Sequence, residues 1–236
     1  MNEFRLPVAL LAGGLATRLR PITESIPKAL VEIAGRPFID HQLALFAQHG
    51  ITDVVLCLGY LGEMVQAHVG DGRAFGLTVS YSYDGPRLRG TGGALRHAAA
   101  MLGDAFWVVY GDSYLEIDYP EIEQDFLANE ALGLMTIYRN SNHWDRSNVD
   151  FRDGELRDYN KRTPTLTMAY IDYGAALLRQ EALRFLPADD PADLADLYHT
   201  LVRERAMIGY VVTRRFFEIG SPVGLAETRA YLGRRG

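Results

Sequence analysis

Short, almost continuous apolar runs alternate with amphipathic segments from the N-terminus to about Asn140. Such runs are typical of strands buried on both faces, whereas apolar residues spaced three and four apart indicate helices. The pattern predicts strands at 8–11, 53–58, 77–83, 106–110 and 132–138, and helices at 38–49, 61–69, 93–101 and 120–129. Because strands and helices alternate, we expect an α/β, Rossmann-like fold: a mixed, mostly parallel sheet with helices on both faces.

The pattern changes beyond Asn140. Two short strand-like segments flank Arg152-Asp153-Gly154, which predicts a β-hairpin. Further strands are expected at 170–178 and 210–219, and helices at 193–207 and 223–232. No low-complexity linker or internal repeat divides the chain. We therefore expect a single domain over residues 1–236, with a core of about 1–140 and a smaller closing segment of about 141–236.

Composition narrows the class of protein. No apolar run reaches the ~20 residues that a membrane span needs, and no secretory signal pattern opens the chain. Cys57 is the sole cysteine and lies in an apolar run, so we expect it in the core of a cytoplasmic protein. The formal charge of −6 argues against nucleic acid as a partner. The oligomeric state is left open, a homo-oligomer included.

The segment from Leu11 to Lys28, LAGGLATRLRPITESIPK, carries the strongest chemical signal. A strand that ends in a Gly-rich loop lets backbone N–H groups approach a phosphate, and Arg18, Arg20 and Lys28 add positive charge. Paired glycines alone more often mark a tight turn, but this concentration of cations favours a nucleoside triphosphate. The spacing fits neither a P-loop nor the dinucleotide fingerprint.

These residues resemble the signature of the sugar-1-phosphate nucleotidyltransferases, L-[AC]-G-G-x-G-T-R-L-x-P followed by P-K. The resemblance implies a GT-A-like fold with a small sugar-binding lid. It also implies that Arg18 and Lys28 are catalytic and that the triphosphate lies against Leu11, Ala12, Gly13, Gly14, Thr17 and Arg18. Ala16 replaces the third glycine of the signature. Since a methyl group demands negative φ, we expect a slightly altered loop or weaker triphosphate binding.

Two acids are candidate metal ligands. Gly111-Asp112 follows the strand at 106–110, where a carboxylate can hold Mg²⁺ or simply cap a turn. The resemblance to the family's N-G-D motif favours Asp112 as a ligand, although Tyr110 replaces the Asn. Glu218-Ile219-Gly220-Ser221-Pro222 is similar to the family's D-[IV]-G-T-P, which implies that Glu218 is the second Mg²⁺ ligand. Glu218 could equally be a strand-end acid before a turn.

Three further segments resemble substrate-binding parts of the family. Gly90, Thr91 and Gly92 belong to a string similar to the base-binding loop G-T-[AG]-G-A-[LI], which otherwise reads as an ordinary helix start. Lys161 matches the lysine that binds the sugar phosphate, although Asn160 replaces the acid before it. Asp172 could accept hydrogen bonds from sugar hydroxyls, and Gly111 is assigned to the sugar phosphate. A solvated lysine and a structural aspartate are the plainer alternatives.

The expected reaction is attack by the ionised oxygen of a sugar 1-phosphate on the α-phosphorus of an NTP, which releases pyrophosphate without a general base. The resemblance points to GTP and to heptose or mannose 1-phosphate, for a cell-surface glycan. Uridylyl or cytidylyl transfer to another phosphate ester is the alternative. A sugar-nucleotide-binding protein without turnover is a third possibility, because Ala16, Asn160 and Glu218 depart from the family pattern.

Overall fold

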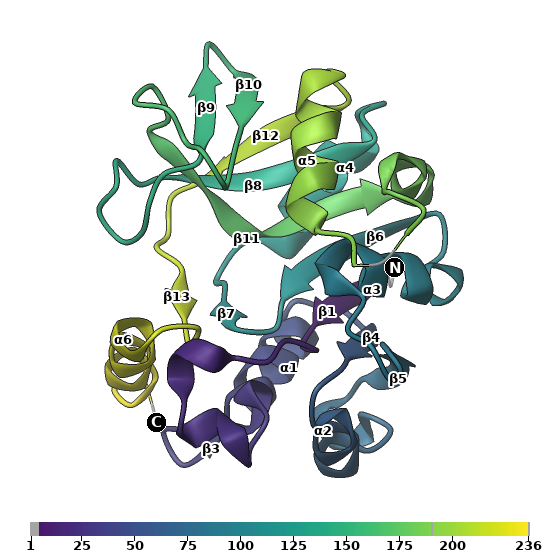
Figure 1. Cartoon of the computed structure of the whole chain (residues 1–236), viewed down its shortest axis with the longest axis vertical. Coiled ribbons are helices and arrows are strands. Elements are labelled where there is room, and N and C mark those ends of the chain that lie inside the picture. The colour runs from purple at the N-terminus through teal and green to yellow at the C-terminus, as the bar shows by residue number, and fades with distance from the viewer. Residues whose placement is uncertain (1–4, 190, 236) are drawn as a thin grey trace.

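The computed structural model describes residues 5–189 and 191–235. One large sheet runs through the molecule (Figure 1). Its strands are β1 (Val8–Leu11), β4 (Asp53–Leu58), β5 (Thr78–Tyr83), β6 (Ala105–Tyr110), β8 (Gly133–Arg139), β9 (Val149–Arg152), β10 (Glu155–Tyr159), β11 (Tyr170–Arg179) and β12 (Met207–Val212). The strand order is β10-β9-β11-β6-β1-β4-β5, and β8 joins β11 to β12.

The direction of the strands determines what meets at the edge of the sheet. Strands β6, β1, β4 and β5 are mutually parallel, so their carboxyl ends lie together. Strand β11 runs antiparallel to β6, and its amino-terminal end reaches the same edge. The predicted mixed, mostly parallel sheet is therefore confirmed.

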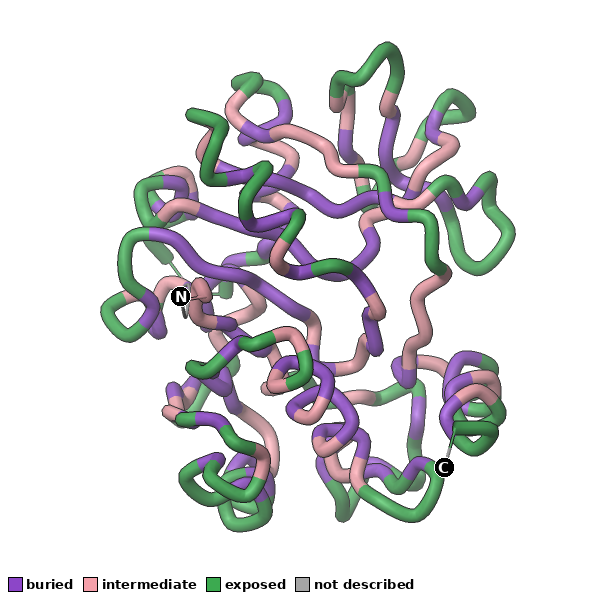
Figure 2. The backbone as a smooth tube through the Cα atoms, turned by 180° about the vertical axis from the view of Figure 1, so that it is seen from behind, coloured by how far each residue is buried: buried purple, intermediate pink, exposed green. Residues whose placement is uncertain are grey.

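Helices cover both faces of this sheet, as predicted. Alternate residues of β6 enter two different core clusters: Trp107 and Val109 face one side, and Phe106 and Val108 face the other. The first side packs on α1 (Phe38–Gln48), α2 (Gly62–Val69) and α4 (Tyr119–Leu127), and the second on α3 (Gly90–Ala98) and α5 (Leu194–Arg203). Figure 2 shows the strands as buried segments through the middle of the molecule. Burial on both faces explains why these strands read as apolar runs.

A smaller structural unit joins the two ends of the chain. Helix α6 (Pro222–Leu232) lies beside the N-terminal loops in Figure 1. Its Leu225 and Leu232 share a third core cluster with Leu19 and Ile33. The short strands of this region are β2 (Glu32–Ile33), β3 (Arg36–Pro37), β7 (Ser113–Tyr114) and β13 (Phe217–Glu218), and short 3₁₀ turns include Thr17–Leu19, Ile22–Glu24 and Lys28–Leu30. Because β13 pairs with β7, Glu218 lies opposite Ser113, next to Asp112.

Some predicted elements differ from the structure. The predicted strand at 210–219 is wrong: β12 and β13 belong to different sheets, and the arginine-containing segment 213–216 passes between them. The predicted helix at 193–207 ends at Arg203, since Arg205 has a left-handed φ of 54° and β12 begins at Met207. Helix α3 begins at Gly90 rather than 93, so the glycine string forms its first turn. None of the helices among the described residues is long and apolar enough to cross a membrane.

Candidate active site

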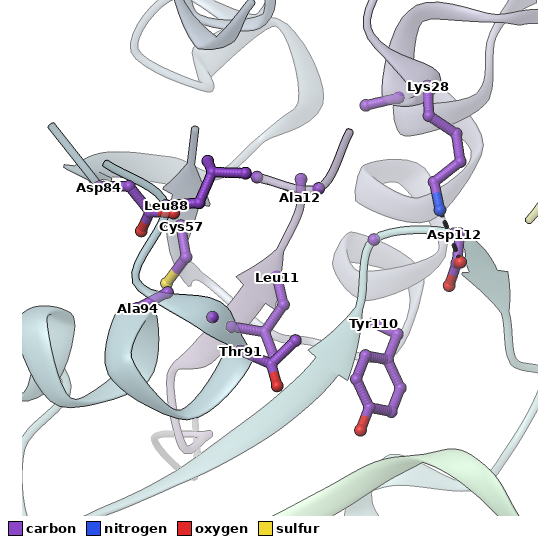
Figure 3. Close-up of a pocket in the computed structure, with 15 residues that line it drawn as sticks. Leu11, Ala12, Lys28, Cys57, Asp84, Leu88, Thr91, Ala94, Tyr110 and Asp112 are labelled. Carbon is purple, nitrogen blue, oxygen red and sulfur yellow. Dashed lines mark hydrogen bonds and ion pairs between the residues drawn. The ribbon is translucent and has the colours of Figure 1, made fainter. Parts of the chain in front are cut away.

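A cavity of about 210 Å³ opens at the carboxyl ends of β1, β4, β5 and β6 (Figure 3). Ligands of open α/β sheets collect at this edge because loops from several strands converge there. The cavity is lined by Leu11, Ala12, Gly13, Gly14, Lys28, Ala29, Cys57, Asp84, Leu88, Gly90, Thr91, Ala94, Tyr110, Gly111 and Asp112. Most of the residues predicted to bind the nucleotide therefore surround one space.

The backbone of the phosphate loop is held against the loop that follows β4. The Ala12 N–H donates to Cys57 O over 2.9 Å, and the Tyr60 N–H donates to Gly13 O over 3.2 Å. A Cβ at Gly13 would lie 2.8 Å from Gly59 N, so a larger residue would push the two loops apart. A Cβ at Gly14 would meet nothing within 4 Å. Gly13 is therefore needed for the close approach of the loops, and Gly14 leaves backbone open to a ligand.

Ala16 differs from the expectation. Its φ of 49° and ψ of 40° are left-handed, so the prediction that the methyl group enforces negative φ is wrong. The carbonyl of Ala16 accepts hydrogen bonds from Thr23 Oγ1 at 2.8 Å and from Leu19 N at 3.1 Å. These bonds hold an alanine in the conformation that glycine adopts most easily. Thr17 and Arg18 follow in the 3₁₀ turn that this conformation starts.

The glycines at the start of α3 allow the segment at Ala192 to pack closely against the helix. A Cβ at Gly90 would lie 2.4 Å from Ala192 O, and one at Gly92 would lie 2.7 Å from the Leu186 side chain. The Gly92 N–H donates to Ala192 O over 2.9 Å and is thus already used within the fold. Thr91 Oγ1 donates to Asp193 Oδ1 and accepts from Leu194 N, and so joins α3 to the start of α5. Gly90 and Thr91 line the cavity, and their contact with a base remains a prediction.

Three charged side chains converge where β13 ends. A Cβ at Gly220 would lie 2.9 Å from Asp112 Oδ2, 3.0 Å from Glu218 Oε2 and 3.2 Å from Arg18 Nη2. Lys28 Nζ donates to Asp112 Oδ2 over 2.7 Å, the interaction marked in Figure 3. Burial has the largest single effect on Asp112 and opposes its ionisation, but Lys28, together with Ser113 and Lys161, lowers the pKa of Asp112 overall. The sequence segments at Arg18, Lys28, Asp112 and Glu218 are thus brought to one place.

Glu218 also stabilises the start of α6. Its carboxylate accepts hydrogen bonds from Gly220 N, Ser221 N and Ser221 Oγ. In the part of the chain that the structure describes, no group of three or more His, Cys, Asp and Glu side chains is placed to hold a metal ion. Mg²⁺ commonly takes only one or two carboxylates, with waters and substrate phosphates completing its shell. Asp112 Oδ2 and Glu218 Oε2 both lie beside Gly220, 2.9 and 3.0 Å from the position its Cβ would take, so the two carboxylates are neighbours, as two ligands of such an ion must be.

A second cavity of about 510 Å³ adjoins the first and shares Tyr110 and Asp112 with it. The polar residues that line it include Arg18, Ser113, Asp145, Arg146, Asn148, Lys161, Asp172, Glu218 and Ser221. Lys161 Nζ lies 5.4 Å from the centroid of the Tyr110 ring. Gly111, predicted to bind the sugar phosphate, lines the first cavity rather than this one.

Asp172 reaches the second cavity because β11 is antiparallel to β6 and is bulged beyond Asp172, where Gly174 has a φ of 102°. Its Oδ1 accepts from Gly174 N at 3.0 Å, and its N–H donates to Asn148 Oδ1 over 2.9 Å. Burial raises the pKa of Asp172, and Lys161 offsets part of this effect. Asp172 and Lys161 are thus two opposite charges in one cavity.

Sequence reasoning missed several residues that line the two cavities. Asp84 directly follows β5 and lines the first cavity. Asp112 was selected because it follows a strand, and the same reasoning would have selected Asp84. Cys57 is buried as predicted, with its pKa raised to about 12 by burial, but its side chain also faces the first cavity (Figure 3). Tyr110 forms a wall between the two cavities, and Asn148 and Arg146 belong to a loop whose sequence carries no motif.

The chain matches the family model described as Nucleotidyl transferase over residues 8–147. It is 28% identical over 230 residues to the N-acetylmuramate alpha-1-phosphate uridylyltransferase of Neisseria meningitidis serogroup B, covering 95% of this chain and 97% of that enzyme. It is 36% identical over 132 residues to the mannose-1-phosphate guanylyltransferase of Mycobacterium tuberculosis, covering 56% of this chain and 36% of that longer enzyme.

Solved structures support the same fold. UTP-bound UGPase from Acinetobacter baumannii superposes with a TM-score of 0.82 at 18% identity, covering 99% of this chain and 95% of that one. The predicted GT-A-like nucleotidyltransferase fold is therefore confirmed. Since the family model covers more than half of the chain, this protein belongs to the nucleotidyl transferase family, and the relatives it matches include sugar-1-phosphate nucleotidyltransferases.

Proposed function

We propose that this protein transfers a nucleotidyl group from an NTP, with GTP as the first candidate, to a sugar 1-phosphate, and so makes a nucleotide sugar and pyrophosphate. The observation that carries this proposal is the meeting of two cavities at Asp112, beside Lys28 and Arg18. The first cavity would take the nucleotide and the second the sugar. The phosphates of both substrates would then meet where the cations converge.

The chemistry requires placement of charge rather than a base. A sugar 1-phosphate is already ionised near neutral pH, so its oxygen can attack the α-phosphorus directly. The protein must align two polyanions and stabilise the charge that develops between them. We assign Arg18 and the loop from Leu11 to Thr17 to the triphosphate. Lys28 would bridge the two reacting phosphates, and Lys161 would hold the phosphate of the sugar.

We further propose that Asp112 and Glu218, whose carboxylates lie beside each other next to Gly220, hold Mg²⁺. The ion supplies neutralisation of phosphate charge when it is bound. Lys28 forms an ion pair with Asp112, which compensates this partly buried carboxylate. Both acids also have hydrogen-bond partners within the protein: Asp112 accepts from Lys28 and Ser113, and Glu218 accepts three hydrogen bonds at the start of α6.

Asp84 adds a structural argument for guanine to the sequence resemblance. Its side chain is 7% exposed, lines the first cavity, and accepts the Arg89 N–H through Oδ2. Guanine offers two adjacent donors, N1–H and the 2-amino group, which suit a carboxylate, whereas uracil offers only N3–H between two carbonyl oxygens. An Asp84→Asn variant should therefore lose activity with GTP and gain activity with XTP, which replaces the 2-amino donor by an acceptor.

Two acceptors are carried forward. The sequence resemblance favours heptose or mannose 1-phosphate, in a route to a surface glycan. Uridylyl transfer to N-acetylmuramate 1-phosphate is the second candidate, because the Neisseria enzyme matches along nearly its whole length.

The test is pyrophosphate release with Mg²⁺, crossing the four common NTPs with heptose, mannose, glucose and N-acetylmuramate 1-phosphates. Release that requires both an NTP and a sugar phosphate supports the transfer, and the best pair identifies the substrates. Lys28→Ala should lower turnover by at least about 100-fold while the protein stays folded. If the protein binds nucleotide but releases no pyrophosphate with any pair, it is a sugar-nucleotide-binding protein rather than an enzyme.

A further inference from the structure

The second cavity contains a cation for which the proposed reaction has no use. Arg18, Lys161 and Arg146 all line it. The reaction assigns Arg18 to the triphosphate and Lys161 to the sugar phosphate. Among the ion pairs formed by residues 5–189 and 191–235, none includes Arg146. Its Nη2 donates to Pro164 O over 3.3 Å, which leaves most of the five guanidinium donors for a ligand.

The loop that carries Arg146 is internally bonded. Asn140 is 3% exposed and Ser147 is 1% exposed, and Asn140 Nδ2 donates both to Ser147 Oγ and to Asp145 O. The Trp144 N–H donates to Asn140 Oδ1, and the Arg146 N–H donates to Asp145 Oδ1. Two buried polar side chains thus close the loop on itself. Arg146 is presented to the cavity by a fixed backbone rather than by a loose one.

The position of Arg146 separates it from the reacting phosphates. Lys161 lies over Tyr110, and its charge acts to lower the pKa of both Asp112 and Asp172 against the effect of burial. Arg146 comes instead from the loop between β8 and β9, and its guanidinium contacts Pro164 O. Lys161 therefore belongs to the phosphate end of the cavity, and Arg146 to the part that holds the body of the sugar.

We propose that Arg146 binds a carboxylate on the sugar, and that the acceptor class is therefore the acidic sugar 1-phosphates. This inference rests on the proposed function. A guanidinium pairs with a carboxylate through two parallel hydrogen bonds, a geometry that a neutral hydroxyl cannot match. Of the two acceptors carried forward, only N-acetylmuramate 1-phosphate bears such a group.

The test compares acceptors that differ by one acidic substituent. N-acetylmuramate 1-phosphate is paired with N-acetylglucosamine 1-phosphate, and glucuronate 1-phosphate with glucose 1-phosphate. The wild type should favour the acidic member of at least one pair by about 10- to 100-fold in kcat/KM, as expected for a charge-assisted hydrogen bond. Arg146→Gln should remove this preference by raising KM for the acidic member alone.

Two variants control the result. Arg146→Lys keeps the positive charge but loses the planar guanidinium with its two parallel donors, so it should retain part of the preference for acidic acceptors. Arg157→Gln removes an arginine that pairs with Glu155 outside the cavity, and it should behave as the wild type.

Three outcomes would overturn the inference. Equal use of both members of every pair by the wild type would show that no carboxylate is recognised. An equal loss for acidic and neutral acceptors in Arg146→Gln would place Arg146 on the 1-phosphate, and no loss at all would remove it from the site. If no acceptor releases pyrophosphate, the proposed function fails instead. Calorimetric binding of the same compounds to the wild type and to Arg146→Gln then still tests the carboxylate contact.

Discussion

Ala16 occupies a left-handed conformation in which its methyl group is costly, at the position where the family signature has glycine. The carbonyl bonds to Thr23 and Leu19 show that the loop keeps this conformation despite the cost. The alanine therefore affects stability rather than the path of the phosphate loop. Sequence comparison alone could not separate these two effects, because both follow from the same substitution.

Ala16→Gly should stabilise the protein by about 1 kcal/mol, since the left-handed penalty of ~1–2 kcal/mol exceeds the entropic cost of glycine. Urea unfolding measures this change. Ala34→Gly is a matched control, because Ala34 also has a φ near 50° but lies in the turn between β2 and β3. KM for the NTP should change by less than about twofold in both variants. A several-fold fall in KM for Ala16→Gly alone would show that the methyl group obstructs the triphosphate.

Asp172 has a raised pKa because burial disfavours its charge. A folded-state pKa above the unfolded value means that stability falls as pH rises through the folded pKa, and that this cost is absent below the unfolded value. Asp172→Asn should therefore raise Tm at pH 7, with a gain that disappears toward pH 4. The same variant should raise KM for the sugar 1-phosphate. An unchanged Tm together with an unchanged KM would show that Asp172 neither strains the fold nor binds the acceptor.

The start of α3 both packs against a second segment of the chain and lines a cavity. Its glycines allow the segment at Ala192 to pass at close range, and its first turn also lines the first cavity. A string of glycines before a helix predicts a ligand loop, but it does not reveal a second segment packed behind it. Only the tertiary fold brings Ala192 to Gly90.

Gly90→Ala should cost more than a matched substitution in open space. Gly90 and Gly76 have φ values of 73° and 75°, but a Cβ at Gly90 would lie 2.4 Å from Ala192 O, whereas one at Gly76 would meet nothing within 4 Å. We expect Gly76→Ala to lose ~1–2 kcal/mol and Gly90→Ala to lose about 1–3 kcal/mol more, measured by urea unfolding. Equal losses of unfolding free energy in the two variants would show that the Ala192 segment moves aside at no cost.

Periodicity located the sheet and its helices because these strands are buried on both faces, so their apolar runs reflect tertiary structure directly. It failed at 210–219, where apolar and aromatic residues favour one continuous strand, but the segment forms two short strands in different sheets. The sequence motifs selected Arg18, Lys28 and Asp112, which the fold brings together, and of these only Asp112 closely follows a long strand. Arg146 could not be found in this way, because its place depends on buried hydrogen bonds of Asn140 and Ser147 within one loop.

Over the whole molecule, Arg215 connects parts of the fold that surround the second cavity. Its guanidinium lies 3.3 Å from the centroid of the Trp144 ring and 4.7 Å from that of Phe217. It also forms an ion pair with Glu227 of α6. The loop that carries Arg146 is thereby tied to the C-terminal helix, and the crossover between β12 and β13 becomes part of the cavity wall.

Arg215→Ala should raise KM for the sugar 1-phosphate by about 3- to 30-fold, because the Trp144 loop loses a partly exposed cation–π contact and its link to α6. KM for the NTP should stay within about twofold of the wild-type value. Arg214→Ala is the adjacent control: its side chain is 68% exposed and lies 3.9 Å from Glu116, so little change is expected. Equal effects on both substrates would assign Arg215 to general stability.

The shared wall of the two cavities has a consequence for ligand design. Tyr110 and Asp112 line both spaces, so fragments bound in the two cavities would lie close together, on either side of these residues. Two weak fragments, one for each space, could be tethered past them. The second fragment would then bind at a high effective concentration, and the joined compound should hold the enzyme far more tightly than either fragment alone.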